Sequence, residues 1–336
     1  MAGDNTTNVS AISTQRLLHR LVLRWYGRHR RTLPWRDATD PYPVMVSEFM
    51  LQQTQVARVL DHLPRWLIRF PDISALARAS RRDVLLAWSG MGYNRRALYL
   101  HAAAKAIVSD HGGEIPSDPE QLRALPGFGR YTAHAVACFG HRVRLALVDV
   151  NIRRILSRLS ENMQLDSSLL PESSTWDLAQ RLLPSRAFFN WNQALMDLGA
   201  TICTARSPSC ASCPLSRQCP SAHRLGSHAQ RTGSGSQRFR APEMRAPAAV
   251  REVPRRIYRG RVVEFLRGCK GHCASAGMLH QVLFESEREI ERDRLIDILT
   301  TLQKDGMIDL SWRRRRVTQL TAFTAPLSEL RVCLAE

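Results

Sequence analysis

The stretch LPGFGRYTA, Leu125–Ala133, decides the fold of this chain, because it predicts a tight glycine turn between two helices. Pro126, Gly127 and Gly129 precede a helix that we expect to begin near Arg130. Glycine lets the backbone turn tightly, and the turn then exposes several N–H groups at the positive end of a helix. Such an end binds a phosphate without reading its base. A glycine turn between helices can also be purely structural, so the turn alone leaves both readings open.

Helical patterning extends on both sides of this turn, from about residue 14 to residue 222. Apolar residues recur three or four positions apart, as at Leu98, Ala102 and Ala106, and Gly or Pro separates the segments. Strand patterning is nearly absent from this region. We therefore expect an all-α domain, in which the glycine turn is not the dinucleotide-binding turn of a βαβ unit.

Four cysteines follow in the stretch ICTARSPSCASCPLSRQC, within 17 residues: Cys203, Cys210, Cys213 and Cys219. This spacing is typical of a ligand set, because soft thiolates bind zinc or an iron–sulfur cluster and the short spacers can wrap one tetrahedral core. The spacing alone leaves both metals open. A thiolate site fits a reducing compartment, and eight cysteines in 336 residues do not indicate a disulfide framework.

Composition points to a polyanionic partner. The net charge is +18 and arginine supplies most of the excess, with a pI of about 10.6. The guanidinium group of arginine can bind a phosphate with two parallel hydrogen bonds. Nucleic acid is therefore the favoured partner, and a generic basic surface is the alternative. An apolar content of 44% is ample for a core, and 336 residues suggest two domains or one with an appendage.

Targeting signals are absent from the sequence as it stands. No run of about 18 apolar residues predicts a membrane span. The polar start MAGDNTTNVS lacks the charged-then-apolar pattern of a signal peptide, so we predict a disordered tail over 1–13. We expect a monomeric, cytoplasmic bacterial protein that binds duplex DNA.

The last third of the chain changes character. Residues 223–254 are rich in Arg, Gly, Ser and Pro and predict a flexible basic linker. Residues 255–321 predict helices followed by two short strands around an arginine turn, a small basic α+β module resembling a winged helix. We expect Arg313–Arg316 to add phosphate contacts, and we predict a tail over 322–336. Cys269, Cys273 and His280 suggest a second metal site only weakly, and ordinary core or surface roles are favoured.

Four further motifs occur in one order with the hairpin and the cysteines: SEFMLQQTQV (Ser47–Val56), GMGYNRRA (Gly90–Ala97), LVDVNIRR (Leu147–Arg154) and MDLGA (Met196–Ala200). Together they closely resemble the helix–hairpin–helix (HhH-GPD) base-excision DNA glycosylases. Within that family the chain looks most like the MutY-type adenine glycosylases, with endonuclease III as a cousin. The resemblance covers about residues 14–222. It implies a [4Fe–4S] cluster on the four cysteines, and a basic cluster loop in which Arg206 touches DNA.

The resemblance makes Asp149 the catalytic aspartate and Asn151 its polar partner. Breaking a nucleosidic bond builds positive charge on the sugar, which a carboxylate near C1′ stabilises. From its position alone, Asp149 is equally a helix N-cap, and both readings can hold. Val150 stands where small residues are common in the family, which bears on the local fit.

Glu48 lies in an apolar helix among Val46, Phe49 and Met50. Such surroundings should raise the pKa of its carboxyl group, which suits a general acid. The resemblance implies that Glu48 protonates the departing base at adenine N7 and helps to place water. The alternative is a buried glutamate paired with an arginine.

The resemblance assigns the DNA contacts to two groups of residues. Gln52 and Gln53 match positions that enter the duplex at the lesion pair, and Tyr93 matches a residue that wedges beside it; such insertion helps to push a base out of the stack. The hairpin residues Pro126, Gly127, Gly129 and Arg130 match the phosphate-binding turn.

Tyr131 bears on the mechanism. Endonuclease III-like relatives carry a lysine nucleophile there, whereas tyrosine implies hydrolysis without efficient strand cleavage. Tyrosine occurs there both in adenine glycosylases and in thymine/uracil mismatch glycosylases.

One departure concerns specificity. MutY-type enzymes usually carry a C-terminal Nudix-like domain that senses 8-oxoguanine, and residues 223–336 do not resemble one. We therefore predict a monofunctional mismatch glycosylase that removes adenine opposite guanine or 8-oxoguanine. The alternatives are a thymine or uracil glycosylase acting opposite guanine, and a non-catalytic DNA-binding iron–sulfur protein.

Overall fold

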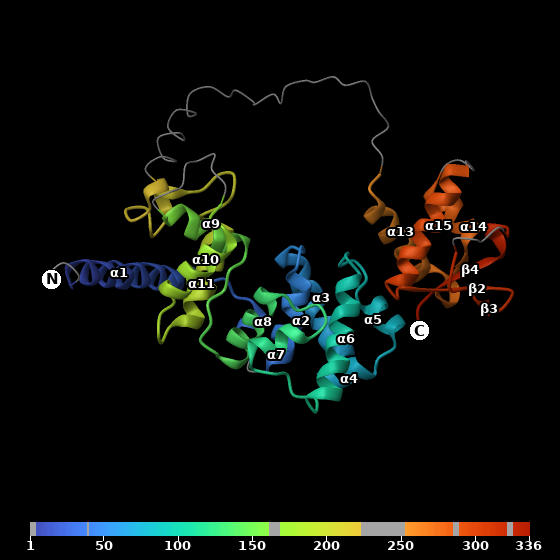
Figure 1. The fold of residues 1–336 in the computed structure, drawn as a ribbon, viewed down its shortest axis with the longest axis horizontal. Helices are drawn as coiled ribbons and strands as arrows, with labels where there is room; N and C mark the ends of the chain where they lie inside the picture. The colour runs from blue at the N-terminus through green and yellow to red at the C-terminus, as the bar shows by residue number, and fades with distance from the viewer. Residues whose placement is uncertain (1–4, 39, 161–168, 223–252, 285–288, 321–324) are drawn as a thin grey trace, which may run out of the picture. The chain divides into compact units, whose positions relative to one another are not determined.

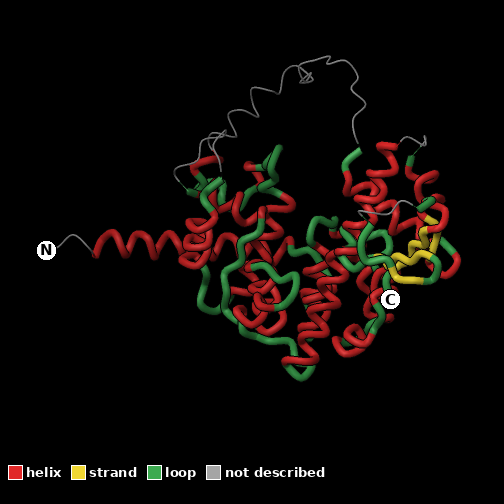
Figure 2. Tube along the Cα trace, turned by 45° about the vertical axis from the view of Figure 1, so that its right-hand side comes forward, coloured by secondary structure: helices red, strands yellow, loops and turns green. Residues whose placement is uncertain are grey.

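The computed structural model describes residues 5–38, 40–160, 169–222, 253–284, 289–320 and 325–336 (Figure 1). The chain divides into two compact units. Helices dominate both, and within the described ranges strands occur only toward the C-terminal end of the chain (Figure 2). The predicted all-α domain with a small α+β module is confirmed. No helix in the described ranges is long and apolar enough to cross a membrane.

The first unit holds the N-terminal helix and the middle of the chain. Its helical elements are α1 (Asn5–His29), η1 (Pro34–Arg36), α7 (Pro119–Ala124), α8 (Arg130–Ala135), the π-helical turn η2 (Val136–Gly140), α9 (Val150–Leu159), α10 (Glu172–Leu182), α11 (Phe188–Thr201) and η3 (Cys210–Ser212). Helix α11 packs against both α1 and α9. Val22, Ile152 and Leu198 from these three helices meet in one buried core. The predicted tail over 1–13 is wrong in part, because α1 begins at Asn5.

The second unit begins with five helices: α2 (Pro41–Leu51), which starts at the boundary of the first unit, α3 (Val56–Arg69), α4 (Ile73–Arg78), α5 (Arg81–Ala87) and α6 (Arg95–Asp110). Side chains cap the short ones: Asp72 accepts a hydrogen bond from Ala75 N at 2.7 Å, and Ser80 accepts one from Asp83 N at 3.0 Å. Trp66 and Trp88 pack edge to face, with ring centroids 5.4 Å apart.

The C-terminal module completes the second unit. In chain order it contains α13 (Arg255–Gly268), η4 (Lys270–His272), β1 (Cys273–Ser275), α14 (Ala276–Leu283), α15 (Glu289–Lys304), β2 (Ile308–Trp312), β3 (Arg315–Arg316), η5 (Leu327–Glu329) and β4 (Leu330–Leu334). The strands form one antiparallel sheet in the order β1-β4-β2-β3. Leu85 of α5 shares the core of this module with Leu266 and Leu299.

Two sequence predictions for this region need correction. The predicted tail over 322–336 is wrong, because β4 lies between β1 and β2 in the sheet. Strand pairing also sets Cys273 opposite Cys333, with 4.0 Å between their Cα atoms, and the two form a disulfide bond that the sequence did not predict. Cys273 is therefore not a free metal ligand beside Cys269 and His280. The predicted linker, residues 223–254, lies almost entirely outside the described ranges.

Candidate functional site

The predicted hairpin forms, and Gly127 has to be glycine. Its φ is +80°, and a Cβ atom there would lie 2.6 Å from Tyr99 Cβ and 2.9 Å from Phe49 Cε1. Gly129 then caps α8, which begins at Arg130. The turn leaves both glycines and Arg130 exposed.

Arg130 is held in place by an aromatic side chain of the same unit. Its guanidinium carbon lies 3.9 Å from the centroid of the Trp176 ring, and Trp176 itself is buried. A cation over an aromatic face is attracted by the ring quadrupole. This contact presents a fixed positive charge at the hairpin.

Asp149 is the N-cap of α9, as one reading of the sequence predicted. Its Oδ1 accepts a hydrogen bond from Ile152 N at 2.7 Å, and its Oδ2 accepts one from Asn151 Nδ2 at 2.9 Å. Burial raises the pKa of Asp149, although the hydrogen bonds from Ile152 and Asn151 act in the opposite direction. Both carboxylate oxygens are thus fixed in direction.

A single arginine connects Asn151 to the cysteine loop. Arg154 donates from Nη2 to Asn151 Oδ1 at 2.8 Å and to Gly199 O at 2.7 Å, and from Nε to Cys203 O at 2.7 Å. The orientation of Asp149 therefore depends, through Asn151 and Arg154, on the backbone at Cys203.

Tyr131 and Val150 stand near the ends of two helices of the first unit. Tyr131 is the second residue of α8, and its hydroxyl lies 4.0 Å from Met196 Sδ of α11. Val150 is 74% exposed, directly after Asp149. The exposed valine beside the half-buried Asp149 carboxylate places an apolar side chain on the solvent side of this helix end.

The MDLGA motif contains a buried ion cluster that the sequence did not predict. Asp197 is fully buried and lies 2.6 Å from Arg31 Nε and 2.7 Å from Arg36 Nη2. Burial by itself would raise the pKa of Asp197, but the hydrogen bonds and charges of Arg36 and Arg31 outweigh it and lower the pKa. The partners are 161 and 166 residues apart in sequence, so no local pattern could reveal the pairing.

The four cysteines of the predicted ligand set influence one another electrostatically. Burial raises the pKa of Cys213 to about 11, and the neighbouring thiols of Cys203, Cys219 and Cys210 add to the rise. No trio of His, Cys, Asp or Glu side chains in the described part of the chain is arranged to hold a metal ion. Four thiols within 17 residues of sequence nevertheless fit the donor chemistry of an iron–sulfur cluster.

The cysteine loop is also tied to α9. Arg158 Nη1 lies 3.2 Å from Cys203 Sγ and donates to Thr204 O at 2.8 Å, while its own carbonyl oxygen accepts from Cys219 Sγ at 3.3 Å. Arg206 is exposed in this loop, and its contact with DNA stays a prediction. One helix therefore carries both Asp149 and the anchor of the loop.

In the second unit, Glu48 occupies the buried face of α2. It is 4% exposed, and Val46, Phe49 and Met50 beside it are fully buried. The apolar surroundings that the sequence predicted for this carboxyl group are confirmed. Its role as a general acid stays a prediction.

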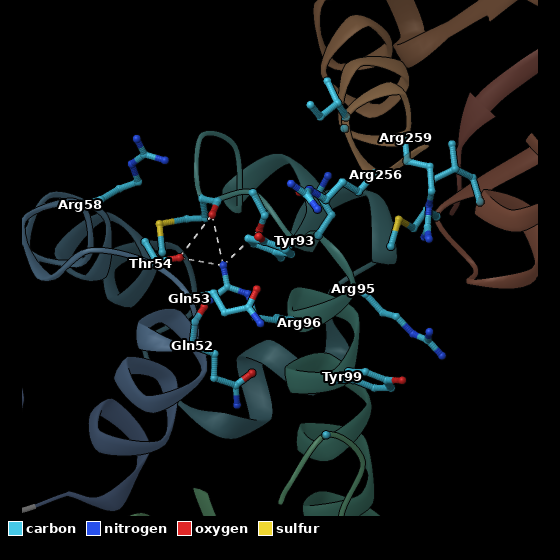
Figure 3. A pocket seen from close by; sticks show the side chains of 18 of the residues that line it. Gln52, Gln53, Thr54, Arg58, Tyr93, Arg95, Arg96, Tyr99, Arg256 and Arg259 are labelled. Carbon is cyan, nitrogen blue, oxygen red and sulfur yellow. Dashed lines mark hydrogen bonds between the residues drawn. The ribbon is translucent and has the colours of Figure 1, made fainter. Parts of the chain in front are cut away.

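Gln53 and Tyr93 sit on two turns of unusual backbone conformation. Their φ values are +57° and +46°, which are strained for residues other than glycine. Tyr93 is 54% exposed. Strain of this kind is common at functional sites, and the side chains of both residues line a single cleft (Figure 3).

Arg96 joins the two turns, and the sequence analysis did not assign it a role. It donates to the carbonyl oxygens of Phe49 and Met50 at 2.8 Å each and to that of Gln52, all at the C-terminal end of α2. Its other nitrogen donates to the hydroxyl group of Thr54 and to the carbonyl oxygens of Met91 and Gly92 (Figure 3). Burial lowers the pKa of this guanidinium to about 10, so the residue remains charged at neutral pH. The adjacent arginines Arg95 and Arg96 in GMGYNRRA are the sequence feature that could have indicated this role.

The two turns border a cleft of about 830 Å³. Gln52, Gln53 and Tyr93 line it, as do Arg58 and Arg95 (Figure 3). The structure thus brings together the three side chains that the sequence assigned to the lesion pair. Hairpin glycine Gly127 also reaches this cleft.

Comparison with known proteins identifies the family. Residues 46–176 match the HhH-GPD superfamily of base excision DNA repair proteins, a range that contains Glu48, the hairpin and Asp149. The chain is 37% identical over 297 residues to the adenine DNA glycosylase of Mycolicibacterium smegmatis, covering 86% of this chain and 91% of that protein. The chain belongs to the HhH-GPD superfamily. The 297-residue match is longer than the 14–222 region, so it reaches beyond the glycosylase domain.

Two further proteins are similar to this chain. The adenine DNA glycosylase of Mycobacterium tuberculosis is 48% identical over 197 residues, a match that spans 58% of this chain and 64% of that protein. A solved thermostable thymine-DNA glycosylase has a TM-score of 0.58 and 26% identity, and it aligns with 64% of this chain over 99% of its own length. The predicted glycosylase fold is confirmed by both kinds of likeness.

Proposed function

We propose that the protein is a monofunctional adenine DNA glycosylase of base excision repair, acting on adenine mispaired with guanine or 8-oxoguanine. The observation that carries most weight is the match over 91% of the Mycolicibacterium smegmatis adenine DNA glycosylase. The hydrogen-bonded carboxylate of Asp149 and the buried carboxyl group of Glu48 supply the chemistry that such hydrolysis needs.

The reaction divides between the two carboxyl groups. Glu48 donates its proton to N7 of the flipped adenine, and the bonding pair of the N-glycosidic bond leaves with the base. Positive charge develops on the sugar, and the Asp149 carboxylate stabilises it. Water then adds to C1′ and passes its proton to the Glu48 carboxylate, which restores the acid for the next turnover. Asn151 keeps the carboxylate directed, because its amide occupies the second oxygen at 2.9 Å.

Tyr131 restricts the outcome to base removal. A phenol cannot form the Schiff base through which a lysine amine would cleave the strand. The expected product is therefore an intact strand with an abasic site.

DNA binding is distributed over several basic groups. The hairpin residues Pro126, Gly127, Gly129 and Arg130, and Arg206 of the cysteine loop, bind phosphates, while Gln52, Gln53 and Tyr93 contact the lesion pair. In the C-terminal module, whose order of helices and strands fits a winged helix, Arg313–Arg316 add phosphate contacts. Two of these four are partly neutralised: Arg313 lies 3.7 Å from Glu329, and Arg316 lies 3.1 Å from Asp309.

Cys203, Cys210, Cys213 and Cys219 would hold a [4Fe–4S] cluster. Such a cluster supplies structural support for the loop that carries Arg206, since its four ligands lie along that loop. The placement of the four thiols within 17 residues supports this assignment over scattered surface cysteines.

The test is single-turnover base excision by anaerobically purified protein on four matched duplexes containing A·8-oxoG, A·G, T·G or U·G, with alkali to reveal abasic sites. Release of adenine supports the proposal. Release of only thymine or uracil would replace it with the alternative of a thymine or uracil glycosylase acting opposite guanine, which the lack of resemblance to a Nudix-like domain in residues 223–336 and the likeness to a thymine-DNA glycosylase favour. Duplex binding without any excision would support the remaining alternative, a non-catalytic DNA-binding iron–sulfur protein.

A further inference from the structure

The cleft beside Gln53 and Tyr93 has a second wall that the superfamily motifs do not supply. Arg256, Ile257, Arg259 and Gly260 of α13 line it (Figure 3). Both walls belong to the same compact unit. The C-terminal module therefore contributes side chains to the predicted lesion-recognition cleft.

Hydrogen bonds fix α13 to the helices that carry the recognition turns. Arg267 Nη2 donates to Leu85 O at 2.7 Å and to Asn94 Oδ1 at 3.0 Å. Asn94 directly follows Tyr93, so the C-terminal end of α13 is hydrogen-bonded to the turn that carries Tyr93, the predicted wedge residue. These hydrogen bonds hold α13 in place as a wall of the cleft.

The cleft is positively charged. Its lining contains no acidic residue and five arginines: Arg58, Arg95, Arg96, Arg256 and Arg259. Three of the five are already engaged. Arg96 holds the two turns, and Asp305 pairs with both Arg259 and Arg95, the latter at 3.6 Å.

Two arginines of the lining remain without a carboxylate partner among the described residues. Arg58 donates from Nη1 to Gly90 O at 3.1 Å. The other is Arg256 of α13. It is exposed, and among the residues that the structure describes no carboxylate pairs with it. Its neighbour Arg255 lies 3.1 Å from Asp297 and does not line the cleft. Arg256 and Arg255 therefore form a natural comparison of equal charge and adjacent position.

The lining chemistry suits a nucleotide. Arginine binds phosphate, amide side chains such as those of Gln52 and Gln53 pair with base edges, and the rings of Tyr93 and Tyr99 offer stacking faces. A volume of about 830 Å³ falls within the ordinary range of ligand sites, roughly 300–1,000 Å³. Glu48 and Asp149 do not line this cleft, so it is not the site that holds the excised base.

We propose that this cleft binds a nucleotide of the DNA strand opposite the excised base, with Arg256 of α13 on its phosphate and the turn side chains on its base. This inference rests on the proposed glycosylase function. The C-terminal module then takes part in recognising the opposite strand, although it does not resemble a Nudix-like domain.

Two pairs of variants of the full-length protein test the assignment. Arg256→Ala removes the positive charge that α13 presents to the cleft without a carboxylate partner in the described residues. Arg255→Ala, at a position outside the cleft, is its matched control. At Gly260, nothing lies within 4 Å of an added Cβ atom, so Gly260→Glu and Gly260→Gln both fit and differ by one charge in the cleft. Replacing a glycine inside α13 does not threaten the helix, because glycine is a poor helix former.

The readout is binding to a duplex that carries an uncleavable abasic-site analogue opposite guanine, measured over a range of salt concentrations. We expect Arg256→Ala to weaken binding about tenfold and to reduce the salt slope by about one. Arg255→Ala should bind within about twofold of the parent protein, and Gly260→Glu should bind more weakly than Gly260→Gln. A photoreactive nucleotide opposite the lesion should cross-link to the α13 peptide.

Equal binding by Arg256→Ala and Arg255→Ala, together with equal binding by the two Gly260 variants, would overturn the proposal. So would α13 cross-links that come only from the strand of the excised base. These outcomes are separate from failure of the proposed function, which would appear as an absence of adenine release by the parent protein.

Discussion

Gly199 of α11 lies directly against Asn151 of α9: a Cβ atom added at Gly199 would be 2.6 Å from Asn151 Cβ. The close approach of these two helices depends on the missing side chain. Because Asn151 holds one oxygen of Asp149, the glycine acts on the predicted catalytic carboxylate through one intermediate residue.

Gly199→Ala should therefore push Asn151 away from Asp149. We expect overpacking to cost about 1–3 kcal/mol of stability, and the misplaced carboxylate to slow single-turnover excision by up to about 100-fold. Gly27→Ala in α1 is the control, since nothing lies within 4 Å of its added Cβ atom. An excision rate equal to that of the parent protein would show that Asn151 does not position Asp149.

Asp149→Asn should abolish excision while duplex binding persists, because an amide cannot stabilise the sugar cation as a carboxylate does. In the parent protein the pKa of Asp149 is raised by burial, so activity should fall with decreasing pH at values above 3.8, the ordinary aspartate pKa. A raised folded-state pKa also means that ionised Asp149 costs stability at neutral pH. The variant should thus gain stability relative to the parent protein as pH rises, which thermal unfolding from pH 4 to 8 measures.

Asp197→Asn should be strongly destabilising. It leaves Arg31 and Arg36 without their buried partner, and breaking a buried pair costs about 3–5 kcal/mol. The pKa of Asp197 is lowered, so the stabilisation is present above the unfolded-state value of 3.8 and is lost as pH falls through the folded-state value. Asp83→Asn is the control: its ion pair with Arg69 is exposed and should contribute only about 0–1 kcal/mol.

Arg96→Lys should weaken lesion recognition more than folding. A lysine ammonium has three N–H donors on one atom and cannot reproduce the hydrogen bonds that the two terminal nitrogens of Arg96 make to six acceptors in the two turns. We expect at least about a tenfold loss in discrimination between mispaired and fully paired duplexes, equivalent to roughly 1.4 kcal/mol. Arg255→Lys, at an exposed arginine outside the cleft, should keep its discrimination.

Iron analysis tests the cysteine ligand set. Purified protein should contain iron and acid-labile sulfide in a ratio of about one, and Cys213→Ser should lose most of both. Cys269→Ser should keep the full iron content, because Cys269 lies outside the set. Zinc in place of iron would refute the cluster.

Local chemistry carried much of the sequence prediction. The turn at Gly127 and the cap at Asp149 depend on neighbours within a few residues, and both form as expected. The burial of Glu48 also followed from its adjacent apolar residues.

Long-range pairing escaped prediction. Asp197 meets arginines more than 160 residues away, and Arg96 contacts carbonyl groups that carry no side-chain signature. Strand β4 is only five residues long, and its place beside β1 and β2 is set by partners elsewhere in the chain. Its pairing with β1 in turn created the Cys273–Cys333 bond.

Arg96 also bears on how a duplex would be engaged. Because one guanidinium holds both the Gln52–Thr54 turn and the turn at Gly92, Gln53 and Tyr93 cannot shift independently. Because Gln53 and Tyr93 form a rigid pair, they cannot adjust to an undistorted DNA duplex. The DNA must therefore deform when the two side chains contact it. Sequences that kink or unstack easily would then be engaged at lower cost than stiff ones. The protein would thereby distinguish an easily deformed mispair from a stiff, fully paired duplex before any side chain contacts a base edge.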